Sequence, residues 1–551
     1  MMLGSVDRWI RNPRVEPFIV FSLALVLYCI NLDRSPHPDE LHHVLAAQHL
    51  LETGRPLIGE GEYWRGILHT WLVAISYETL GEGLASARAP SVLLAASGAA
   101  VLFVWVRREA GRLAAWLSAV LFISSPFTIE IAQFSRFYAL QLVSFLLGAI
   151  CVYYAMAATA SLRRRLIYCV LALGLLALST WLQSTSLMGL VGLSVWIFVV
   201  MALKFMAELR ATQTTRNALV PVLVAAGAFV ALATIPSGTI YDVWHQYRRS
   251  MLFNAHSQDE FWFYHVRFLI FYPTLWSLVG FLAAFAVVHK ARLAWLAIAV
   301  FSSSFVLASF AGPKATRYLS FAQPFLAILW GVGLAYLVPT LGRLAEATQI
   351  RLSATLALPR RLESMVVVTV VGSAVAIVIL MNPFWIRSAT MIGDITMPFE
   401  KPSSDWRAAR AALAPWTSDA DIMITTEELG AIYFLGRSDV RYSPSKLLEL
   451  REDQQFEFGI DYRTGRPVIS KPESMRRLIE CFDRGLIVGP IEHWGNSNLI
   501  NEPVQAMLMA HTTPIGVPKE SHLYARGWHR EPRQTKPDYC ADLRRFSARR
   551  R

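Results

Sequence analysis

Apolar segments long enough to cross a membrane recur along the first 390 residues of this 551-residue chain. A helix needs about 20 predominantly apolar residues to cross the hydrocarbon core of a bilayer. The pattern predicts eleven spanning helices, at residues 17–32, 87–106, 113–130, 138–160, 166–182, 185–203, 218–236, 267–288, 293–311, 319–339 and 365–386. Charged residues make up only 17% of the chain, against about 25% in a typical soluble protein. The sequence therefore predicts an α-helical polytopic membrane protein.

The basic residues fall on alternate connections between these segments. If the N-terminus is cytoplasmic, every predicted inside connection is net basic, as the positive-inside bias requires. These connections contain Arg107, Arg108, Arg112, Arg163, Arg164, Arg165, Lys204, Arg210, Arg216, Lys290, Arg292, Arg343, Arg351, Arg360 and Arg361. The same bias explains the net charge of +12 without nucleic acid, because the cations are dispersed along the chain. Residues 33–86 and everything after the last segment are then expected outside the cell membrane.

The first outer loop, residues 33–86, contains two helical patterns. One runs from Asp39 to Glu52 and the other from Ile67 to Leu80. Trp64, Trp71 and Tyr77 favour amphipathic helices that lie in the membrane interface. A second helix that dips into the bilayer is the alternative. Residues 1–390 are thus expected to form a transmembrane domain that includes this loop.

Residues 395–551 have a different composition and contain no further apolar segment of spanning length. Strands are predicted at 421–426 and 485–489, and a helix at 473–482, which is typical of a small α/β domain. Residues 451–472 are polar and are expected to be an irregular insertion. No glycine-rich phosphate loop is present, so no nucleotide site is predicted. Cys481 and Cys540 both fall here, as either a disulfide or two separate thiols.

Two adjacent carboxylates, Asp39 and Glu40, follow the first predicted span. One interpretation is structural: Pro38 and two acids are typical of a helix start, where negative charge meets the positive end of the helix dipole. The other is catalytic, since a carboxylate can act as a general base on an alcohol. The pair alone does not decide between them.

Several cations lie at the outer ends of predicted spans, against the positive-inside bias. They are Arg65, Arg136, Arg248, Arg249, Lys314 and Arg317. Each alone is compatible with a snorkelling side chain, but together they indicate an anion bound at headgroup level, such as a phosphate. A carboxylate pair beside such cations fits group transfer from a lipid-linked phosphate. It fits a transporter less well, because transporters hold their polar groups near the midplane.

These motifs resemble the GT-C superfamily of glycosyltransferases, which use polyprenyl-phosphate-linked sugars. Asp39-Glu40 is similar to the acidic pair of protein O-mannosyltransferases and bacterial lipid A aminoarabinose transferases. Arg136-Phe-Tyr138 resembles their Arg-x-Tyr element, and Lys314-Ala-Thr-Arg317-Tyr318 their late Arg-Tyr signature. The segment from Tyr63 through Arg65 to His69 resembles a phosphate-contacting region that has lysine in the aminoarabinose enzymes. Asp405 to Gly436 resembles the start of the bacterial outer domain.

The resemblance implies an extracytoplasmic C-terminal α/β domain and a multi-pass protein of the bacterial inner membrane, with the C-terminal domain in the periplasm. Asp39 and Glu40 are then the catalytic pair, and Asp39 is the base. The donor phosphate is expected to be bound by Arg65, Arg136, Tyr138, Lys314, Arg317 and Tyr318. Tyr63 and His69 are expected to contact substrate. The acceptor is a hydroxyl of a glycan, lipid or protein.

No cofactor and no dedicated metal site are expected to be required, although a divalent cation shared by Asp39 and Glu40 stays open. Two other functions also remain open. One is a flippase or exporter of lipid-linked sugar, and the other is a polymerase or ligase that uses a diphosphate-linked oligosaccharide. The early acidic pair and the outer α/β domain favour the glycosyltransferase.

Overall fold

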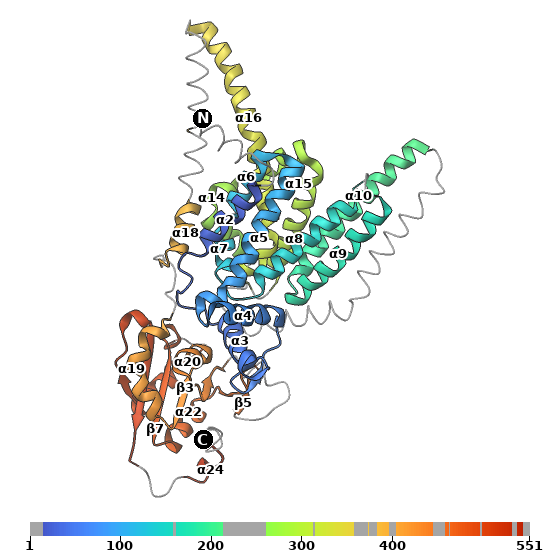
Figure 1. The fold of residues 1–551 in the computed structure, drawn as a ribbon. Helices are drawn as coiled ribbons and strands as arrows, with labels where there is room; N and C mark the ends of the chain where they lie inside the picture. Colours follow the sequence, from blue (N-terminus) through green and yellow to red (C-terminus); the bar gives the residue numbers. More distant parts are fainter. Residues whose placement is uncertain are drawn as a thin grey trace. The chain divides into compact units, whose positions relative to one another are not determined.

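The computed structural model is mostly α-helical, with a sheet region at the C-terminus (Figure 1). It describes residues 15–157, 161–212, 261–311, 314–356, 373, 383–395, 404–444, 458–461, 463–495, 499–531 and 537–543. The chain divides into two compact units. The helical unit comprises residues 1–31, 91–133 and 137–395. The sheet unit comprises residues 32–90, 134–136 and 396–551, so the first loop groups with the C-terminal part.

The helical unit contains the apolar segments. Its elements are α2 (Glu16–Tyr28), most of α5 (Leu84–Ala110), α6 (Arg112–Ile123), α7 (Pro126–Ala132), α8 (Tyr138–Ala155), α9 (Leu162–Leu182), α10 (Ser186–Thr212), α13 (Phe263–Phe271), α14 (Pro273–Ser277), α15 (Val279–Phe310), η1 (Thr316–Ala322), α16 (Gln323–Leu356) and α18 (Pro383–Ile392).

Among the described residues, six helices are long and apolar enough to cross a membrane. A seventh candidate is α6 with α7, which bend by 62° at the break between them. The predicted segments 218–236 and 365–386 lie outside the described residues, and the first segment corresponds to the 13-residue helix α2. The polytopic helical class is therefore supported, while the count of eleven stays a prediction.

The predicted connection at Lys290 and Arg292 is a kink within α15. Lys290 has φ −139° and ψ 52°, outside the helical region, and helix continues on both sides of it. The predicted span 267–288 instead begins as α13 and α14, which break before Pro273. Proline has no N–H to continue the hydrogen bonding of the helix before it, which explains the break there.

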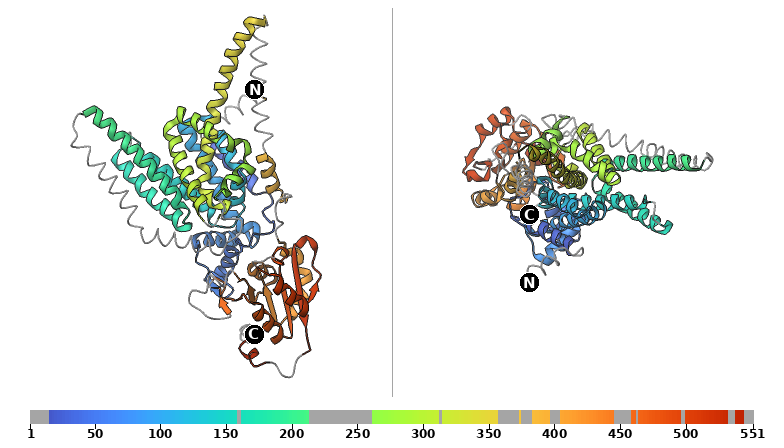
Figure 2. Two further views of the ribbon diagram at one scale, coloured as in Figure 1. Left: turned by 180° about the vertical axis from the view of Figure 1, so that it is seen from behind. Right: turned by 90° about the horizontal axis from the view of Figure 1, so that it is seen from above.

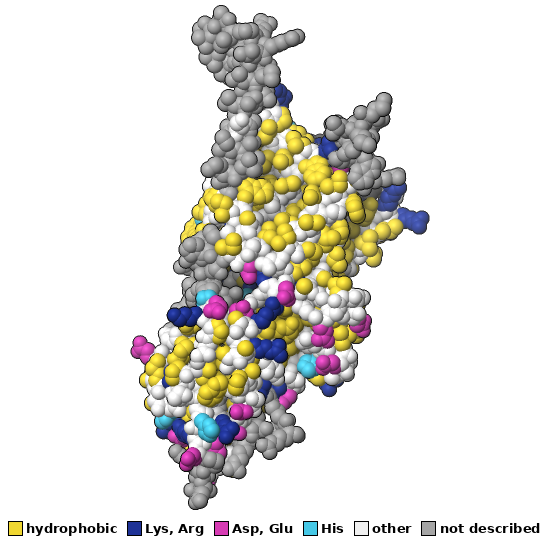
Figure 3. Space-filling model, turned by 60° about the vertical axis from the view of Figure 1, so that its left-hand side comes forward, with side chains coloured by type: hydrophobic (Ala, Val, Ile, Leu, Met, Phe, Trp, Pro, Cys, Tyr) yellow, Lys and Arg dark blue, Asp and Glu magenta, His cyan; other side chains and the backbone are white. Residues whose placement is uncertain are grey.

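Several helices expose apolar side chains. Helices α9 and α10 lie side by side (Figures 1 and 2), and Val170 and Leu173 on α9 are 69% and 74% exposed. Figure 3 shows hydrophobic side chains gathered over the visible face of the helical unit. Water disfavours apolar surfaces of this extent, whereas acyl chains do not. The helices thus have the surface expected of membrane-embedded elements.

The sheet unit is built on a seven-stranded mixed sheet with the order β5-β6-β4-β3-β7-β9-β8. The strands are β3 (Ile422–Thr425), β4 (Val440–Tyr442), β5 (Phe458–Ile460), β6 (Pro467–Ile469), β7 (Arg484–Pro490), β8 (Thr513–Ile515) and β9 (Leu523–His529). Strands β6, β4, β3 and β7 are parallel, and the outer pairs are antiparallel. Continuous burial along β3 fits a central parallel strand covered on both faces.

Helices cover both faces of this sheet. Helices α19 (Trp406–Asp419) and α20 (Glu428–Leu435) pack on one core, which includes Leu413, Met423 and Leu486. Helices α22 (Pro472–Cys481) and α23 (Glu502–His511) pack on the other, with Ile424 and Ile487. The remaining elements here are η2 (Ile491–His493), η3 (Lys519–Ser521) and α24 (Cys540–Leu543). The predicted α/β layer is therefore present.

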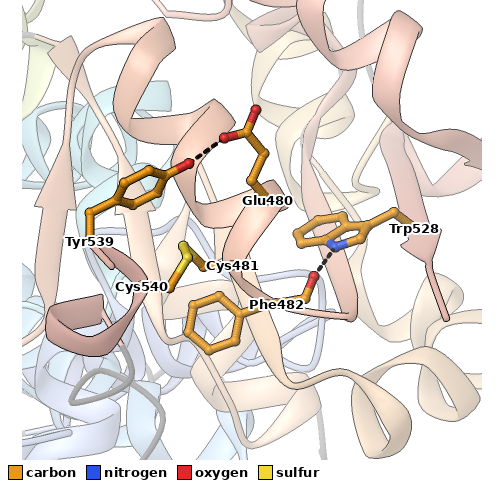
Figure 4. Close-up of a disulfide and its surroundings, with 6 residues drawn as sticks. All are labelled: Glu480, Cys481, Phe482, Trp528, Tyr539 and Cys540. Carbon is orange, nitrogen blue, oxygen red and sulfur yellow. Dashed lines mark hydrogen bonds between the residues drawn. A yellow bond between two sulfur atoms is a disulfide. The ribbon is translucent and has the colours of Figure 1, made fainter. Parts of the chain in front are cut away.

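The predicted strands at 421–426 and 485–489 correspond to β3 and β7, and the predicted helix at 473–482 corresponds to α22. The expectation of an irregular 451–472 insertion is wrong in part, because β5 and β6 form an antiparallel pair there. Three-residue strands leave too short an alternation to recognise in a sequence. Cys481 and Cys540 form a disulfide with a Cα–Cα distance of 5.2 Å, close to Trp528 and Tyr539 (Figure 4).

The first loop folds as predicted into two helices. They are α3 (Leu41–Thr53) and α4 (Ile67–Leu80), joined by the short pair β1 (Leu57–Ile58) and β2 (Gly61–Glu62). Val44, Val73 and Tyr77 share a core with Leu429 of α20. The first loop is therefore packed onto the C-terminal domain. This packing holds the start of α3 in place.

Candidate functional site

Glu40 is a buried carboxylate with both oxygens engaged. Its Oε1 accepts hydrogen bonds from the Arg88 side chain at 2.8 Å and from the backbone N–H of His37 at 2.9 Å. Its Oε2 accepts from Arg88 Nε at 2.8 Å and from the Ser135 N–H at 3.0 Å. Burial opposes ionisation, but Arg88 and the two N–H groups outweigh it and lower the pKa of Glu40. Glu40 is thus held ionised at the start of α3.

Arg88 joins three segments of the sheet unit. Besides its bidentate pair with Glu40, its Nη1 donates to the carbonyl oxygens of Leu32 and Arg34, at 2.6 and 3.0 Å. The Arg88 side chain is fully buried. Bidentate arginine–carboxylate pairs fix orientation as well as supplying energy. The pair therefore positions the chain on both sides of Asp39.

Asp39 differs from Glu40 because it is partly open to solvent. Its side chain is 33% exposed, and its Oδ1 lies 3.3 Å from Nη1 of the buried Arg136. Arg136 also donates to the Asp39 carbonyl at 3.0 Å and, through Nη2, to the Tyr63 hydroxyl at 3.4 Å. An accessible carboxylate oriented by a buried guanidinium can accept a proton from a bound hydroxyl.

Aromatic and histidine side chains pack beside this carboxylate. The Tyr63 ring lies 4.9 Å from His42 and 5.3 Å from His43, and His69 lies 5.0 Å from His43. His43 Nδ1 is 2.9 Å from the Thr70 hydroxyl, and His42 Nδ1 is 3.2 Å from the Asp39 carbonyl. The sheet unit thus brings Tyr63 and His69 into the same cluster as Asp39, Glu40 and Arg136.

The buried histidines are neutral near pH 7. Burial lowers the pKa of His42 to about 3, and Arg136 and Arg463 add to the effect. Burial, with Arg136, also lowers the pKa of His69 to about 3. Burial, with His69 and Arg136, brings the pKa of His43 well below its ordinary value. The three histidines therefore add no positive charge beside Asp39.

These lowered pKa values predict how stability depends on pH. An unfolded histidine takes up a proton near pH 6.5, whereas His42 in the folded chain does not until about pH 3. Stability should therefore fall as pH drops from 6.5 towards 3, by about 1.4 kcal/mol per pH unit for each such histidine. In urea denaturation across pH 6.5–4, His42→Asn should flatten this slope, and exposed His511→Asn should not. Identical slopes for both variants would contradict the assignment.

The remaining predicted site residues lie in the helical unit. Lys314 is 3% exposed and lies two residues before η1, which contains Arg317 and Tyr318. The ring centroids of Tyr138 and Tyr318 are 6.4 Å apart, so the two predicted tyrosines lie close together. The Thr316 hydroxyl donates to Glu130 at 2.7 Å and fixes the start of η1. Arg65 belongs to the sheet unit, where its side chain is exposed.

Sequence reasoning missed three residues that complete the cluster. Arg88 stands at the start of an apolar segment, where a single arginine was a usable signal. Ser135 contributes a backbone N–H, which carries no side-chain signal. Arg463 comes from the C-terminal domain, and its Nη1 lies 3.4 Å from His42 Nε2. No group of three or more His, Cys, Asp or Glu side chains within the described ranges is arranged to hold a metal ion.

The fold places the chain among known proteins. No family model matches the sequence, and no curated protein matches it. Solved structures with the same fold include GT-C superfamily glycosyltransferases, so the fold implied by the sequence motifs is confirmed.

Two of these structures are ArnT from Cupriavidus metallidurans. The apo state is 14% identical, with a TM-score of 0.57 over 96% of this chain and 100% of that chain. ArnT bound to undecaprenyl phosphate is 14% identical, with a TM-score of 0.56 over 94% and 100%. The archaeal oligosaccharyltransferase AglB from Archaeoglobus fulgidus, with an inhibitory peptide and a dolichol-phosphate, is 12% identical, with a TM-score of 0.50 over 88% and 70%. At these identities the likeness establishes the fold.

Proposed function

We propose that this protein is a glycosyltransferase that moves a sugar from a polyprenyl-phosphate donor to an acceptor hydroxyl on the outer face of the membrane. The observation that carries the proposal is the accessible Asp39 carboxylate, 3.3 Å from buried Arg136, in a chain with the GT-C fold. The undecaprenyl phosphate bound to ArnT and the dolichol-phosphate bound to AglB support a lipid-phosphate donor.

In the proposed reaction Asp39 takes the proton of the acceptor hydroxyl as the acceptor oxygen attacks the anomeric carbon. The bond between that carbon and the phosphate oxygen breaks, and its electron pair leaves with the polyprenyl phosphate. Positive charge develops on the sugar ring in an oxocarbenium-like transition state. Because phosphate leaves readily as an anion, no general acid is required.

The cations have two roles in this scheme. Arg136 orients Asp39 through their 3.3 Å contact, and its charge favours the departing phosphate. Lys314 and Arg317 of the helical unit, with Tyr138 and Tyr318 beside them, bind the phosphate as its negative charge grows. Arg65 lies at the exposed edge of the Asp39 cluster and adds a further positive charge.

Glu40 acts as a positioning residue in the proposal, because Arg88 and two backbone N–H groups engage both of its oxygens. Tyr63 and His69, which are buried beside Asp39, are proposed to shape the wall of the substrate site. The protein is proposed to cross the bacterial inner membrane about eleven times. Its N-terminus lies in the cytoplasm, and residues 395–551 form a periplasmic domain.

The stereochemistry of the product tests the proposed displacement. A single attack by the acceptor oxygen inverts the anomeric carbon, whereas a double displacement through a covalent intermediate retains its configuration. Purified protein in nanodiscs, given a polyprenyl-phosphate sugar and a membrane extract as acceptor source, should yield a product of opposite anomeric configuration by NMR. A product that retains the configuration would exclude single displacement with Asp39 as base.

A further inference from the structure

The C-terminal domain reaches the Asp39 cluster through the β5–β6 connection, defined here as Asp461 and residues 463–466. This connection packs tightly against the turn between β1 and β2. The Glu60 N–H donates to the Thr464 carbonyl at 2.9 Å, and Arg466 lies 3.7 Å from the Glu60 carboxylate. A Cβ on Gly61 would lie 2.6 Å from the Arg463 backbone. Only glycine fits at this approach, so the connection is closely held.

Within this connection, Arg463 is anchored on one side and directed at the site on the other. Its Nη2 and Nε donate to the two oxygens of the fully buried Asp461, at 2.9 and 3.2 Å. Its Nη1 lies 3.4 Å from His42 Nε2, on the helix that begins after Asp39 and Glu40. The Arg463 side chain remains 25% exposed. The guanidinium is therefore oriented before any substrate binds.

The charges around this point do not balance. Asp461 pairs with Arg463 at 2.9 Å, and Arg441, 3.5 Å from Asp461, pairs more closely with Glu428 at 3.0 Å. Tyr63 is buried, which raises its pKa, and His42 is neutral, so neither supplies a compensating charge. The charged groups that act on Tyr63 include the arginines Arg65, Arg136 and Arg463 and the carboxylate Asp39. Asp461 pairs with Arg463 from the other side. A local excess of positive charge beside a partly exposed guanidinium favours an anionic ligand.

We propose that Arg463 binds an anionic group of a substrate, phosphate or carboxylate, so that the C-terminal domain supplies part of the substrate site. The planar guanidinium suits both groups, which accept parallel N–H donors. This inference rests on the proposed glycosyltransferase function. Because Arg463 lies 3.4 Å from His42, the anionic group is bound next to the start of α3. Both a lipid-linked phosphate and an acidic acceptor carry such a group.

Binding measurements on the full chain in nanodiscs test Arg463 without requiring turnover. The two probes are undecaprenyl phosphate for the donor side and inorganic phosphate for the acceptor side. The affinity for each probe is measured from the rise of the thermal unfolding midpoint as the probe is added. Arg463→Gln should lower the affinity for at least one probe by about tenfold, because a hydrogen bond to a charged group is lost. Arg463→Lys should retain part of the affinity, because it keeps the charge. Arg476→Gln is the matched control, since Arg476 lies exposed on α22 of the same domain.

The probe for which Arg463→Gln loses affinity identifies the source of the anionic group. Unchanged affinity of Arg463→Gln for both probes, relative to Arg476→Gln, would overturn the inference. So would failure of the unsubstituted protein to bind either probe. Comparable unfolding midpoints without probe show that the variants are folded. A wild-type protein that binds a probe but transfers no sugar would contradict the proposed function and leave the Arg463 result standing.

Discussion

Replacing Asp39 by Asn is expected to reduce sugar transfer by about 10²–10⁴-fold, the usual contribution of a positioned general base. Asparagine keeps the size of the side chain and can still accept a hydrogen bond from Arg136, 3.3 Å away in the native chain. It cannot take the acceptor proton. The measurement is the initial rate of polyprenyl phosphate release in nanodiscs, with undecaprenyl phosphate affinity measured in parallel.

Asp33→Asn is the matched control for this variant. Asp33 lies in the same loop, with its side chain 66% exposed, and pairs with Arg407 at 3.0 Å on the surface. Its replacement should leave the transfer rate within about twofold, because exposed pairs contribute about 0–1 kcal/mol. Full activity in Asp39→Asn would show that another group is the base. Loss of both activity and lipid binding would indicate a structural role.

Glu40→Gln is expected to cause the largest loss of stability, about 3–5 kcal/mol, because it leaves Arg88 charged in a buried site. The native pair has side chains 3% and 1% exposed, and its atoms approach to 2.8 Å. Transfer should fall as well, since the start of α3 carries Asp39. Urea or thermal unfolding of the purified protein measures the stability change.

The double variant Glu40→Gln with Arg88→Met distinguishes the stability cost of an unpaired buried charge from the loss of the contacts that Arg88 makes. Methionine removes the uncompensated guanidinium and keeps much of its apolar volume, so the double variant should be more stable than Glu40→Gln alone. The activity of the double variant should stay low, because the carbonyls of Leu32 and Arg34 lose their donor. If Glu40→Gln unfolds like the native protein, the buried pair does not organise the site.

The pattern of apolar residues in the sequence predicted several helices and strands correctly. The two loop helices were predictable from the helical spacing of their apolar residues, and strands β3 and β7 from short continuous apolar runs. The three-residue strands β5 and β6 were not, since their pairing depends on long-range contacts with β4. The break at Lys290 falls where a connection between two helices was predicted, but its form as a kink was not predictable. Two cations between apolar segments indicate a turn and a kink equally well.

The sequence predicted which residue types form the candidate site, but it predicted less well what each of these residues does. Asp39 and Arg136 lie together as their motifs suggested. The resemblance implied that Asp39 is the base, but the buried and fully engaged state of Glu40 was not predictable, because its neighbours come from positions 88 and 135. Arg463 is separated from His42 by 421 residues, and no local pattern reveals such a contact. Burial and partner identity, which distinguish a base from a positioning group, arise only in the folded chain.

We propose that Asp39 and the cations Lys314 and Arg317 serve one reaction. The most direct measurement is a cryo-EM structure of the full chain in a nanodisc with undecaprenyl phosphate bound. We expect the lipid phosphate at hydrogen-bond distance, about 2.7–3.2 Å, from Lys314 or Arg317, in a cavity onto which the Asp39 carboxylate opens. A phosphate bound elsewhere, or an Asp39 carboxylate facing away from that cavity, would contradict it.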